Sequence, residues 1–169
     1  MPPPLPARYH LEVRIGRDGD VEEWLATDEQ LDRPVLVRVL GPESTPERRE
    51  AFLAHTRLGA SVTHQHVARV YEVDLTEDGA YSVSEWPGGI RLADRDEAGL
   101  GVDPAAFLPN AEGLARGLGA LHEVGFVHGA INGSAVFFSA ARPAKLAAFG
   151  RMPITTTAEA DVRSLAAVL

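Results

Sequence analysis

The sequence contains no cysteine, which excludes disulfide bonds, thiolate catalysis and cysteine metal ligands. It also has no apolar run near the roughly 20 residues that a membrane-spanning helix needs, so this segment itself is not expected to contact a membrane. Basic residues are few: 16 lysines and arginines stand against 24 aspartates and glutamates, and the net charge is −8. Because no basic stripe is available for a phosphate backbone, nucleic acid is excluded as a partner.

The first half of the chain has the pattern of a small β-sheet with one helix. Residues 1–7 are rich in proline and read as a linker. A helix is predicted to begin at Thr45 and Pro46, an N-cap followed by proline at the first helical position. Alternating or β-branched apolar residues predict strands in five segments, at 8–15, 21–27, 34–40, 67–75 and 79–86.

The second half favours helices. The stretch "PGGI", Pro87 to Ile90, indicates a hinge, and a helix capped by Asp103 is predicted to run to about Val124 along an apolar stripe. Short strands are expected at "AVFF" and "AKLAAF". A last helix, "AEADVRSLAAVL", ends in an apolar run, which predicts that the chain is a piece of a longer protein.

Several landmarks occur in the order in which protein kinases carry them. "IGRDGDVEEWLA" lies at the place of the glycine-rich loop, "VLVRVL" at that of V-A-I-K, and "THQHVARVYEV" resembles a stretch of bacterial serine/threonine kinases. "YSVSEWPGG" resembles the hinge, "HGAINGSAV" the catalytic loop, "KLAAFG" the D-F-G strand and "DVRSLAAVL" the start of the central C-lobe helix. The chain thus resembles the protein kinase family over nearly all of residues 8–169.

This resemblance implies an α+β, protein kinase-like two-lobe fold. The expected N-lobe, residues 8–86, holds an antiparallel five-stranded sheet with one helix. The expected C-lobe, residues 87–169, is mostly helical and is truncated within its central helix.

At the positions that carry the chemistry in kinases, the sequence departs from the family pattern. The strand-three lysine is replaced by Arg38, and the glutamate that should pair with it is replaced by His55. Two basic residues cannot form this ion pair, so Arg38 is expected to find another carboxylate. The catalytic base is replaced by Ala130, and the two magnesium ligands by Ala135 and Ala148.

The glycine-rich loop is altered as well. Gly16 matches its first glycine, but four carboxylates follow, at Asp18, Asp20, Glu22 and Glu23. A carboxylate about 4 Å from a phosphate costs about 4 kcal/mol at the dielectric of a protein surface. The segment is therefore expected to form a charged, solvated hairpin that repels a triphosphate.

Taken with the resemblance, these substitutions predict a pseudokinase: a kinase fold that is not an enzyme and that binds no cofactor and no metal. His128 and Asp161 match positions that have structural roles in kinases, and both are retained. The pattern of loss therefore separates residues that touch ATP, metal or substrate from residues that hold the scaffold together.

Among such domains, the chain resembles the kinase-homology domain of actinobacterial MviN-type lipid II flippases. That resemblance implies a regulatory scaffold in peptidoglycan synthesis, phosphorylated by a serine/threonine protein kinase and recognised by a forkhead-associated (FHA) domain. The candidate phosphorylation sites are Thr155, Thr156 and Thr157, in a polar segment. A cytoplasmic location follows, as the cytoplasmic domain of a membrane protein.

Two hypotheses of other classes stay open: an atypical transferase with residual ATP binding, and a sensor of a small molecule or nucleotide. His55, His64 and His66 are the candidates for a metal cluster. However, His64 coincides with a structural histidine of the kinase pattern, and no acidic or thiolate partner is placed near it. No metal site is predicted.

Overall fold

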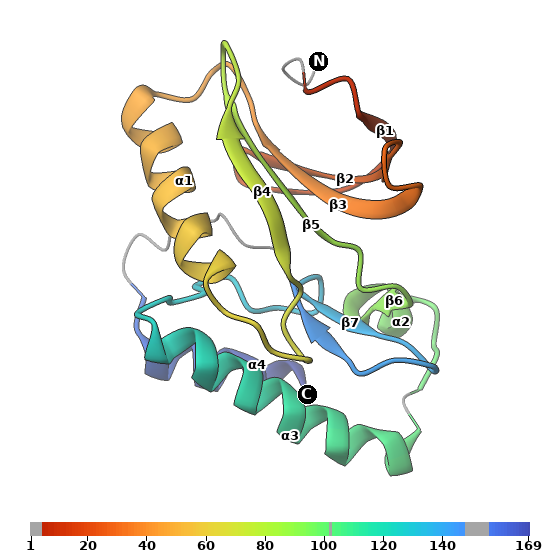
Figure 1. The fold of residues 1–169 in the computed structure, drawn as a ribbon. Coiled ribbons are helices and arrows are strands. Elements are labelled where there is room, and N and C mark those ends of the chain that lie inside the picture. Colours follow the sequence, from red (N-terminus) through yellow and green to blue (C-terminus); the bar gives the residue numbers. More distant parts are fainter. Residues whose placement is uncertain (1–4, 102, 148–155) are drawn as a thin grey trace. The chain divides into compact units, whose positions relative to one another are not determined.

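The computed structural model describes residues 5–101, 103–147 and 156–169, and its chain divides into two compact units (Figure 1). Among the described residues, the first unit comprises 5–60 and 69–86, and the second comprises 61–68, 87–147 and 156–169. Ser61–Ala68, assigned above to the N-lobe, therefore goes with the second unit. The reason is hydrogen bonding: the Ala68 N–H donates to the Leu146 carbonyl at 2.8 Å, and the Leu146 N–H donates to the His66 carbonyl at 2.9 Å.

The first unit is an antiparallel five-stranded sheet with one helix, as the sequence predicts. Its strands are β1 (Tyr9–Asp18), β2 (Val21–Asp28), β3 (Arg33–Leu40), β4 (Val70–Leu75) and β5 (Ala80–Glu85). They lie in the order β1-β2-β3-β5-β4, which leaves β4 at one edge. The helix α1 (Pro46–Ala60) begins where predicted, and the Thr45 hydroxyl oxygen accepts the Arg48 N–H at 3.2 Å.

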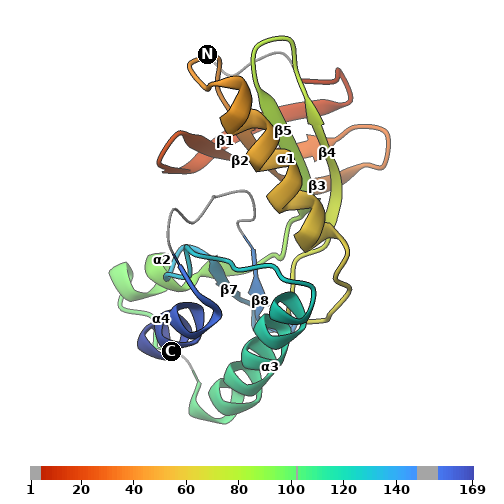
Figure 2. The ribbon, with the colours of Figure 1, turned by 90° about the vertical axis from the view of Figure 1, so that its left-hand side faces the viewer.

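Apolar side chains from alternate positions of β3 fill both faces of this sheet. Val35, Val37 and Val39 lie in one buried cluster, whereas Leu40 lies in another with Phe52 of α1. Because successive strand residues point to opposite faces, the two clusters are the two sides of one sheet. The helix α1 lies against β4 and β5 (Figures 1 and 2).

The second unit contains three helices and a small sheet. The helices are α2 (Leu92–Glu97), α3 (Pro104–Glu123) and α4 (Ala158–Val168). The strands β6 (Ile90–Arg91), β7 (Val136–Phe138) and β8 (Lys145–Leu146) form an antiparallel sheet in that order. Asp103 caps α3 by accepting the Ala105 N–H at 3.0 Å, as predicted, and α4 lies beside α3 (Figure 2).

The core of the second unit forms around α3. Leu114, Leu118 and Leu121 are fully buried, four or three residues apart on one helix face. The expected α+β architecture is thus confirmed: a five-stranded antiparallel sheet with one helix, followed by a largely helical second part. No helix within the described ranges is both long and apolar enough to cross a bilayer.

Candidate functional site

In the first unit, Arg38 is a buried cation at the strand position where kinases carry their lysine. Its side chain is 1% exposed. The register of β2 and β3 places Glu23 directly opposite, and the Arg38 Nε donates to Glu23 Oε1 at 3.0 Å. An Nη of the same guanidinium lies 3.7 Å from Asp18 Oδ2. Arg38 has therefore found carboxylate partners, as expected: Glu23 comes from the neighbouring strand β2 and Asp18 from the end of β1.

The electrostatics of this group follow from its burial. Desolvation lowers the pKa of Arg38 below its ordinary value, and the charges of Glu23 and Asp18 oppose that shift. A guanidinium remains protonated in proteins, so the site is an ion pair. Because the positive charge already faces two carboxylates, it is largely neutralised within the unit. The sequence identified the arginine but not its partner Glu23. The partner can be found by counting outward from the turn between β2 and β3, because Asp28 pairs with Arg33 and five residues further out Glu23 pairs with Arg38.

The predicted solvated hairpin is wrong for Glu23, which is buried, whereas the other carboxylates of the segment keep contact with water and lie near arginines. Glu23 is only 6% exposed because it bonds Arg38 inside the sheet. Asp20 accepts two hydrogen bonds from the Arg48 guanidinium of α1, both at 2.9 Å. Glu22 accepts one from Arg14 at 3.1 Å. The negative charge of this segment is thus matched locally, and two of its contacts tie the segment to β3 and α1.

His55, at the position of the kinase glutamate, lies on α1 and is 8% exposed. It occupies the buried side of the helix together with Phe52 and Thr56. A neutral imidazole at this position is compatible with burial, whereas a lone carboxylate there would pay a large desolvation penalty. The basic residues Arg38 and His55 are therefore both accommodated inside the first unit.

In the second unit, Asp161 of α4 holds the segment that resembles the kinase catalytic loop. Its carboxylate accepts the N–H of His128 at 2.7 Å through Oδ2 and the N–H of Gly129 at 2.7 Å through Oδ1. The His122 Nε2 of α3 lies 3.0 Å from the same Oδ2. Asp161 is only 1% exposed. We call these contacts the Asp161 brace.

The braced segment is fixed at two further points. The imidazole of His128 is buried, and its Nε2 bonds the Ala147 carbonyl at 2.9 Å. Gly129 has a φ of +68°, a backbone conformation that glycine adopts without the steric cost paid by other residues. Glycine therefore suits this position of the loop, where the kinase pattern has arginine. The contact of His122 with Asp161 was not predicted from the sequence. The sequence feature that indicates it is the position of His122 in the last turn of α3, just before the braced segment.

The replaced catalytic positions lie beside this brace. Ala130 and Ala135 are both buried in the second unit. The Ala135 N–H donates to the Asn132 carbonyl at 3.0 Å, and the Ala135 carbonyl accepts the Ala147 N–H at 2.9 Å. A methyl group at either position offers no oxygen for a proton or for Mg²⁺. Ala148 lies outside the described residues.

Two of the three candidate threonines precede α4. Thr156 is half-buried, whereas Thr157 is exposed and is the N-cap of α4. The Thr157 hydroxyl oxygen accepts the Ala160 N–H at 3.2 Å. A hydrogen bond with the Thr157 side chain also lowers the pKa of the Glu159 carboxyl. Thr155 lies outside the described residues.

The histidines weighed as metal ligands are used structurally. The His66 ring is buried, and its Nδ1 bonds the Ala144 carbonyl at 2.8 Å. It packs so tightly on α3 that a Cβ at Gly113 would come within 2.1 Å of it. His64 Nδ1 accepts the His66 N–H at 3.2 Å. These contacts join the loop after α1 to α3 and β8.

Comparison with known proteins matches the amino-acid sequence to a family. The sequence pattern of the family "Protein tyrosine and serine/threonine kinase" matches residues 9–166. The chain belongs to the protein kinase family. This kinase domain is 30% identical over 162 residues to the serine/threonine-protein kinase drp72 of Corynebacterium efficiens. The aligned region covers 88% of the chain and 31% of that relative.

Other relatives are similar. Serine/threonine-protein kinase PknA of Mycobacterium tuberculosis is 30% identical over 153 residues, covering 86% of the chain and 36% of that protein. PknA of Corynebacterium glutamicum is 28% identical over 164 residues, covering 89% of the chain and 35% of that protein. The kinase domain thus spans about a third of the length of these curated relatives.

These comparisons contradict the prediction that the chain is not an enzyme. The matched family is one of protein kinases, and the relatives are named serine/threonine-protein kinases, so the findings point to a kinase. The prediction rested on a few aligned side chains. Those positions alone do not decide activity, because Mg²⁺ keeps several waters and is also held by substrate phosphates.

Proposed function

We propose that this kinase domain is a regulatory, protein-binding partner of a serine/threonine protein kinase, which phosphorylates it on a threonine directly before α4. The observation that carries the proposal is Thr157, an exposed threonine directly before α4 whose hydroxyl caps that helix. A phosphothreonine adds about 1.5 to 2 negative charges and strong acceptor oxygens, which is the chemistry that phosphopeptide-binding domains read.

The position of Thr157 supports a regulatory effect. Thr157 caps the helix that carries Asp161, four residues further on, and Asp161 holds the backbone of His128 and Gly129. A dianion at Thr157 lies close to the carboxylate of Glu159 in the first turn, and like charges repel. Phosphorylation is therefore coupled to the helix end that supports the braced segment.

The partner and the process are proposed from resemblance. In this proposal an FHA domain recognises the phosphothreonine. The kinase domain itself regulates peptidoglycan synthesis, as the cytoplasmic part of an MviN-type membrane protein. What supports this is the likeness of "HGAINGSAV" and "AAFG" to that group of domains, together with kinship to serine/threonine kinases of Corynebacterium and Mycobacterium.

Phosphoryl transfer by the chain itself is the second candidate function. It is favoured by membership of the kinase family and by the retained scaffold of the Asp161 brace. Such activity needs a proton acceptor and metal-binding oxygens other than side chains at positions 130 and 135, where alanines stand.

One experiment separates these functions. The chain is incubated with radiolabelled Mg-ATP, with and without PknA, and the label is mapped by digestion and mass spectrometry. The regulatory proposal expects label that depends on PknA, lies within residues 155–157 and supports capture by an immobilised FHA domain. The variant with Thr155→Ala, Thr156→Ala and Thr157→Ala should lose the label, while the exposed-threonine control Thr63→Ala keeps it.

The alternative outcomes are distinct. Label on a protein acceptor in the reaction without PknA establishes transfer by the chain itself. Label that persists in the triple alanine variant, or an FHA domain that binds the unlabelled chain equally well, contradicts the regulatory proposal.

A further inference from the structure

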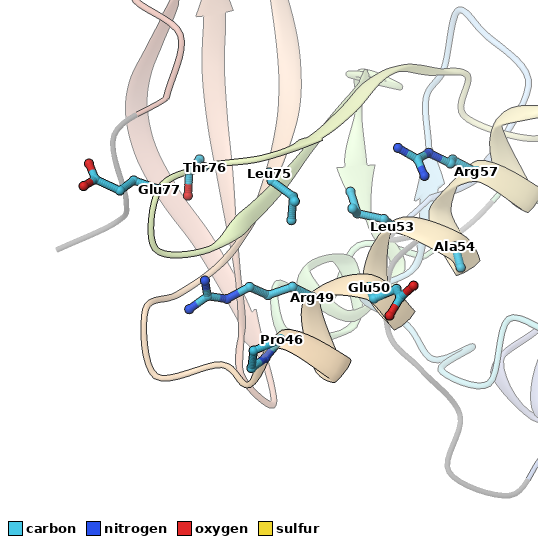
Figure 3. Close-up of a pocket in the computed structure, with 9 residues that line it drawn as sticks. All are labelled: Pro46, Arg49, Glu50, Leu53, Ala54, Arg57, Leu75, Thr76 and Glu77. Atoms are coloured by element: carbon cyan, nitrogen blue, oxygen red, sulfur yellow. The ribbon is translucent and has the colours of Figure 1, made fainter.

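A groove with an apolar floor lies on the first unit, between α1 and the end of β4 (Figure 3). Its volume is about 610 Å³, within the range of about 300–1,000 Å³ usual for binding pockets. All of its lining belongs to the first unit. The lining residues are Pro46, Arg49, Glu50, Leu53, Ala54, Arg57, Leu75, Thr76 and Glu77.

The floor of the groove is apolar and partly open. Leu53 of α1 and Leu75 of β4 point toward each other across it (Figure 3). Leu53 is 8% exposed, so it is already packed in the unit, whereas Leu75 is 52% exposed. An apolar side chain placed beside Leu75 would remove that surface from water, at about 25 cal/mol for each Å².

Two arginines, Arg49 and Arg57, stand at the ends of this floor. Arg49 donates to the Ser44 hydroxyl and to the Pro42 carbonyl, both uncharged acceptors. Arg57 is exposed. In the part of the chain that the structure describes, neither arginine lies within 4.0 Å of a carboxylate oxygen, unlike Arg48 beside them. The groove thus presents two positive charges.

Two glutamates also line the groove, and their positions limit their effect. Glu77 points away from the other lining side chains, and Glu50 is exposed (Figure 3). Charges that are open to water are screened and interact weakly. They weaken the attraction for an anion without neutralising the arginines by direct contact.

The spacing along α1 selects the shape of a ligand. Arg49, Leu53 and Arg57 are four residues apart and therefore share one face of the helix, with steps of about 6 Å along its axis. In an extended peptide, alternate side chains share a face and are spaced by about 6.6 Å. An extended segment with the order acid, any residue, apolar, any residue, acid therefore matches the three positions.

We propose that this groove binds an extended acidic segment of a partner protein, with one large apolar side chain between two carboxylates at alternate positions. The apolar side chain lies between Leu53 and Leu75, and the carboxylates face Arg49 and Arg57. This binding is independent of the phosphorylation proposed above, so either can fail without the other.

The probe is a fluorescein-labelled heptapeptide of the order serine, glutamate, serine, leucine, serine, glutamate, serine, measured by fluorescence anisotropy against the whole 169-residue chain. Two control peptides are used. One has lysines in place of the glutamates, and the other has the same composition with the two glutamates adjacent. The alternating acidic peptide should bind at least about tenfold more tightly than either control, because only it pairs both arginines.

Variants of the chain locate the site. Arg57→Glu and Leu75→Asp should each weaken binding at least about tenfold. Arg17→Glu, which makes the same charge change at an exposed arginine near the end of β1, should leave it unchanged. Glu50→Gln combined with Glu77→Gln should tighten binding about twofold to threefold, since it removes like charge from the rim.

Thermal unfolding of each variant checks that the fold is intact, and both lead substitutions are at exposed residues. Equal binding of the two glutamate peptides would overturn the spacing argument and with it the proposal. So would binding that survives Arg57→Glu and Leu75→Asp in a folded protein, or that falls as much in Arg17→Glu as in Arg57→Glu.

Discussion

The two units bury charge in opposite ways. In the first, the Arg38 guanidinium is matched by the side chains of Glu23 and Asp18. In the second, the Asp161 carboxylate is matched mainly by the backbone N–H groups of His128 and Gly129, with the His122 ring as a further contact. A side-chain pair can be replaced as a pair by apolar residues, whereas a backbone N–H donor stays in place under every substitution except proline. The buried ion pair of Arg38 can thus in principle be exchanged for an apolar pair, whereas the Asp161 carboxylate fixes the backbone path at His128 and Gly129.

The strongest way to break this comparison is to remove Asp161. Asp161→Ala leaves two backbone N–H groups without their acceptor, and the free energy of unfolding should fall by about 4 kcal/mol. Asp161→Asn keeps one acceptor oxygen and should lose about 2 kcal/mol. Urea unfolding at neutral pH measures both, with the exposed Asp96→Ala as the control. A loss below about 1 kcal/mol in Asp161→Ala would show that water or neighbouring groups replace the carboxylate.

The next largest effect belongs to the first unit. Glu23→Leu alone leaves Arg38 buried without its nearest carboxylate and should cost about 3 kcal/mol. Combining it with Arg38→Met should restore the free energy of unfolding to within about 1 kcal/mol of the parent chain, because an apolar pair replaces an ion pair.

A double-mutant cycle from urea unfolding tests this exchange, and Glu29→Gln, at an exposed glutamate, is the control. If the double variant is as unstable as Glu23→Leu alone, the buried pair is not exchangeable. The contrast drawn between the two units would then be wrong.

A smaller effect is expected at Gly129, where the brace meets a special backbone conformation. Gly129 has a φ of +68°, which is unfavourable for alanine. Gly129→Ala should therefore lower the free energy of unfolding by about 1 kcal/mol. Gly119, in the interior of α3, has open space at its Cβ position, so Gly119→Ala should stabilise the protein by about 0.5–1 kcal/mol. Opposite signs in thermal unfolding support the conformational argument, and destabilisation by both changes contradicts it.

Much of the fold could be predicted because the patterns behind it are local. The cap at Asp103, the start of α1 at Pro46 and the β-branched apolar run of β3 each depend on a few neighbouring residues, and all three were found. The grouping of Ser61–Ala68 with the second unit has no local signal, because that segment is held by hydrogen bonds to β8, about 80 residues further along the chain.

The site was predicted less completely, for a physical reason. The expectation that Arg38 has a carboxylate partner follows from the cost of a lone buried charge. The identity of Glu23 depends on strand register, and the contact of His122 with Asp161 depends on how α3 meets α4. The wrong conclusion about enzyme class had another origin, since it treated a few aligned positions as decisive for the whole domain.

The last expected effect appears only at high pH and concerns one unit alone. All three tyrosines of the sequence, Tyr9, Tyr71 and Tyr81, lie in the first unit. Burial, together with a hydrogen bond to Glu72, raises the pKa of Tyr9 from 10.0 to about 12, and the pKa of Tyr81 is raised for the same reasons. The neutral hydroxyl of Tyr9 donates to the Glu72 carboxylate at 2.7 Å, and ionisation would remove that donor and add a like charge.

Because the folded-state pKa of Tyr9 lies above its ordinary value, the folded state holds the hydroxyl proton more tightly than the unfolded chain does. The resulting stability is fully present below pH 10.0 and is lost as the pH rises toward about 12. Urea midpoints measured across this range should fall more steeply for the parent chain than for Tyr9→Phe, while absorbance of tyrosinate follows the ionisation. If the urea midpoints of the parent chain and of Tyr9→Phe fall in parallel with pH, Tyr9 ionises without loss of stability. The tyrosinate and the Glu72 carboxylate would then both be exposed to water, unlike the buried ion pair of Arg38.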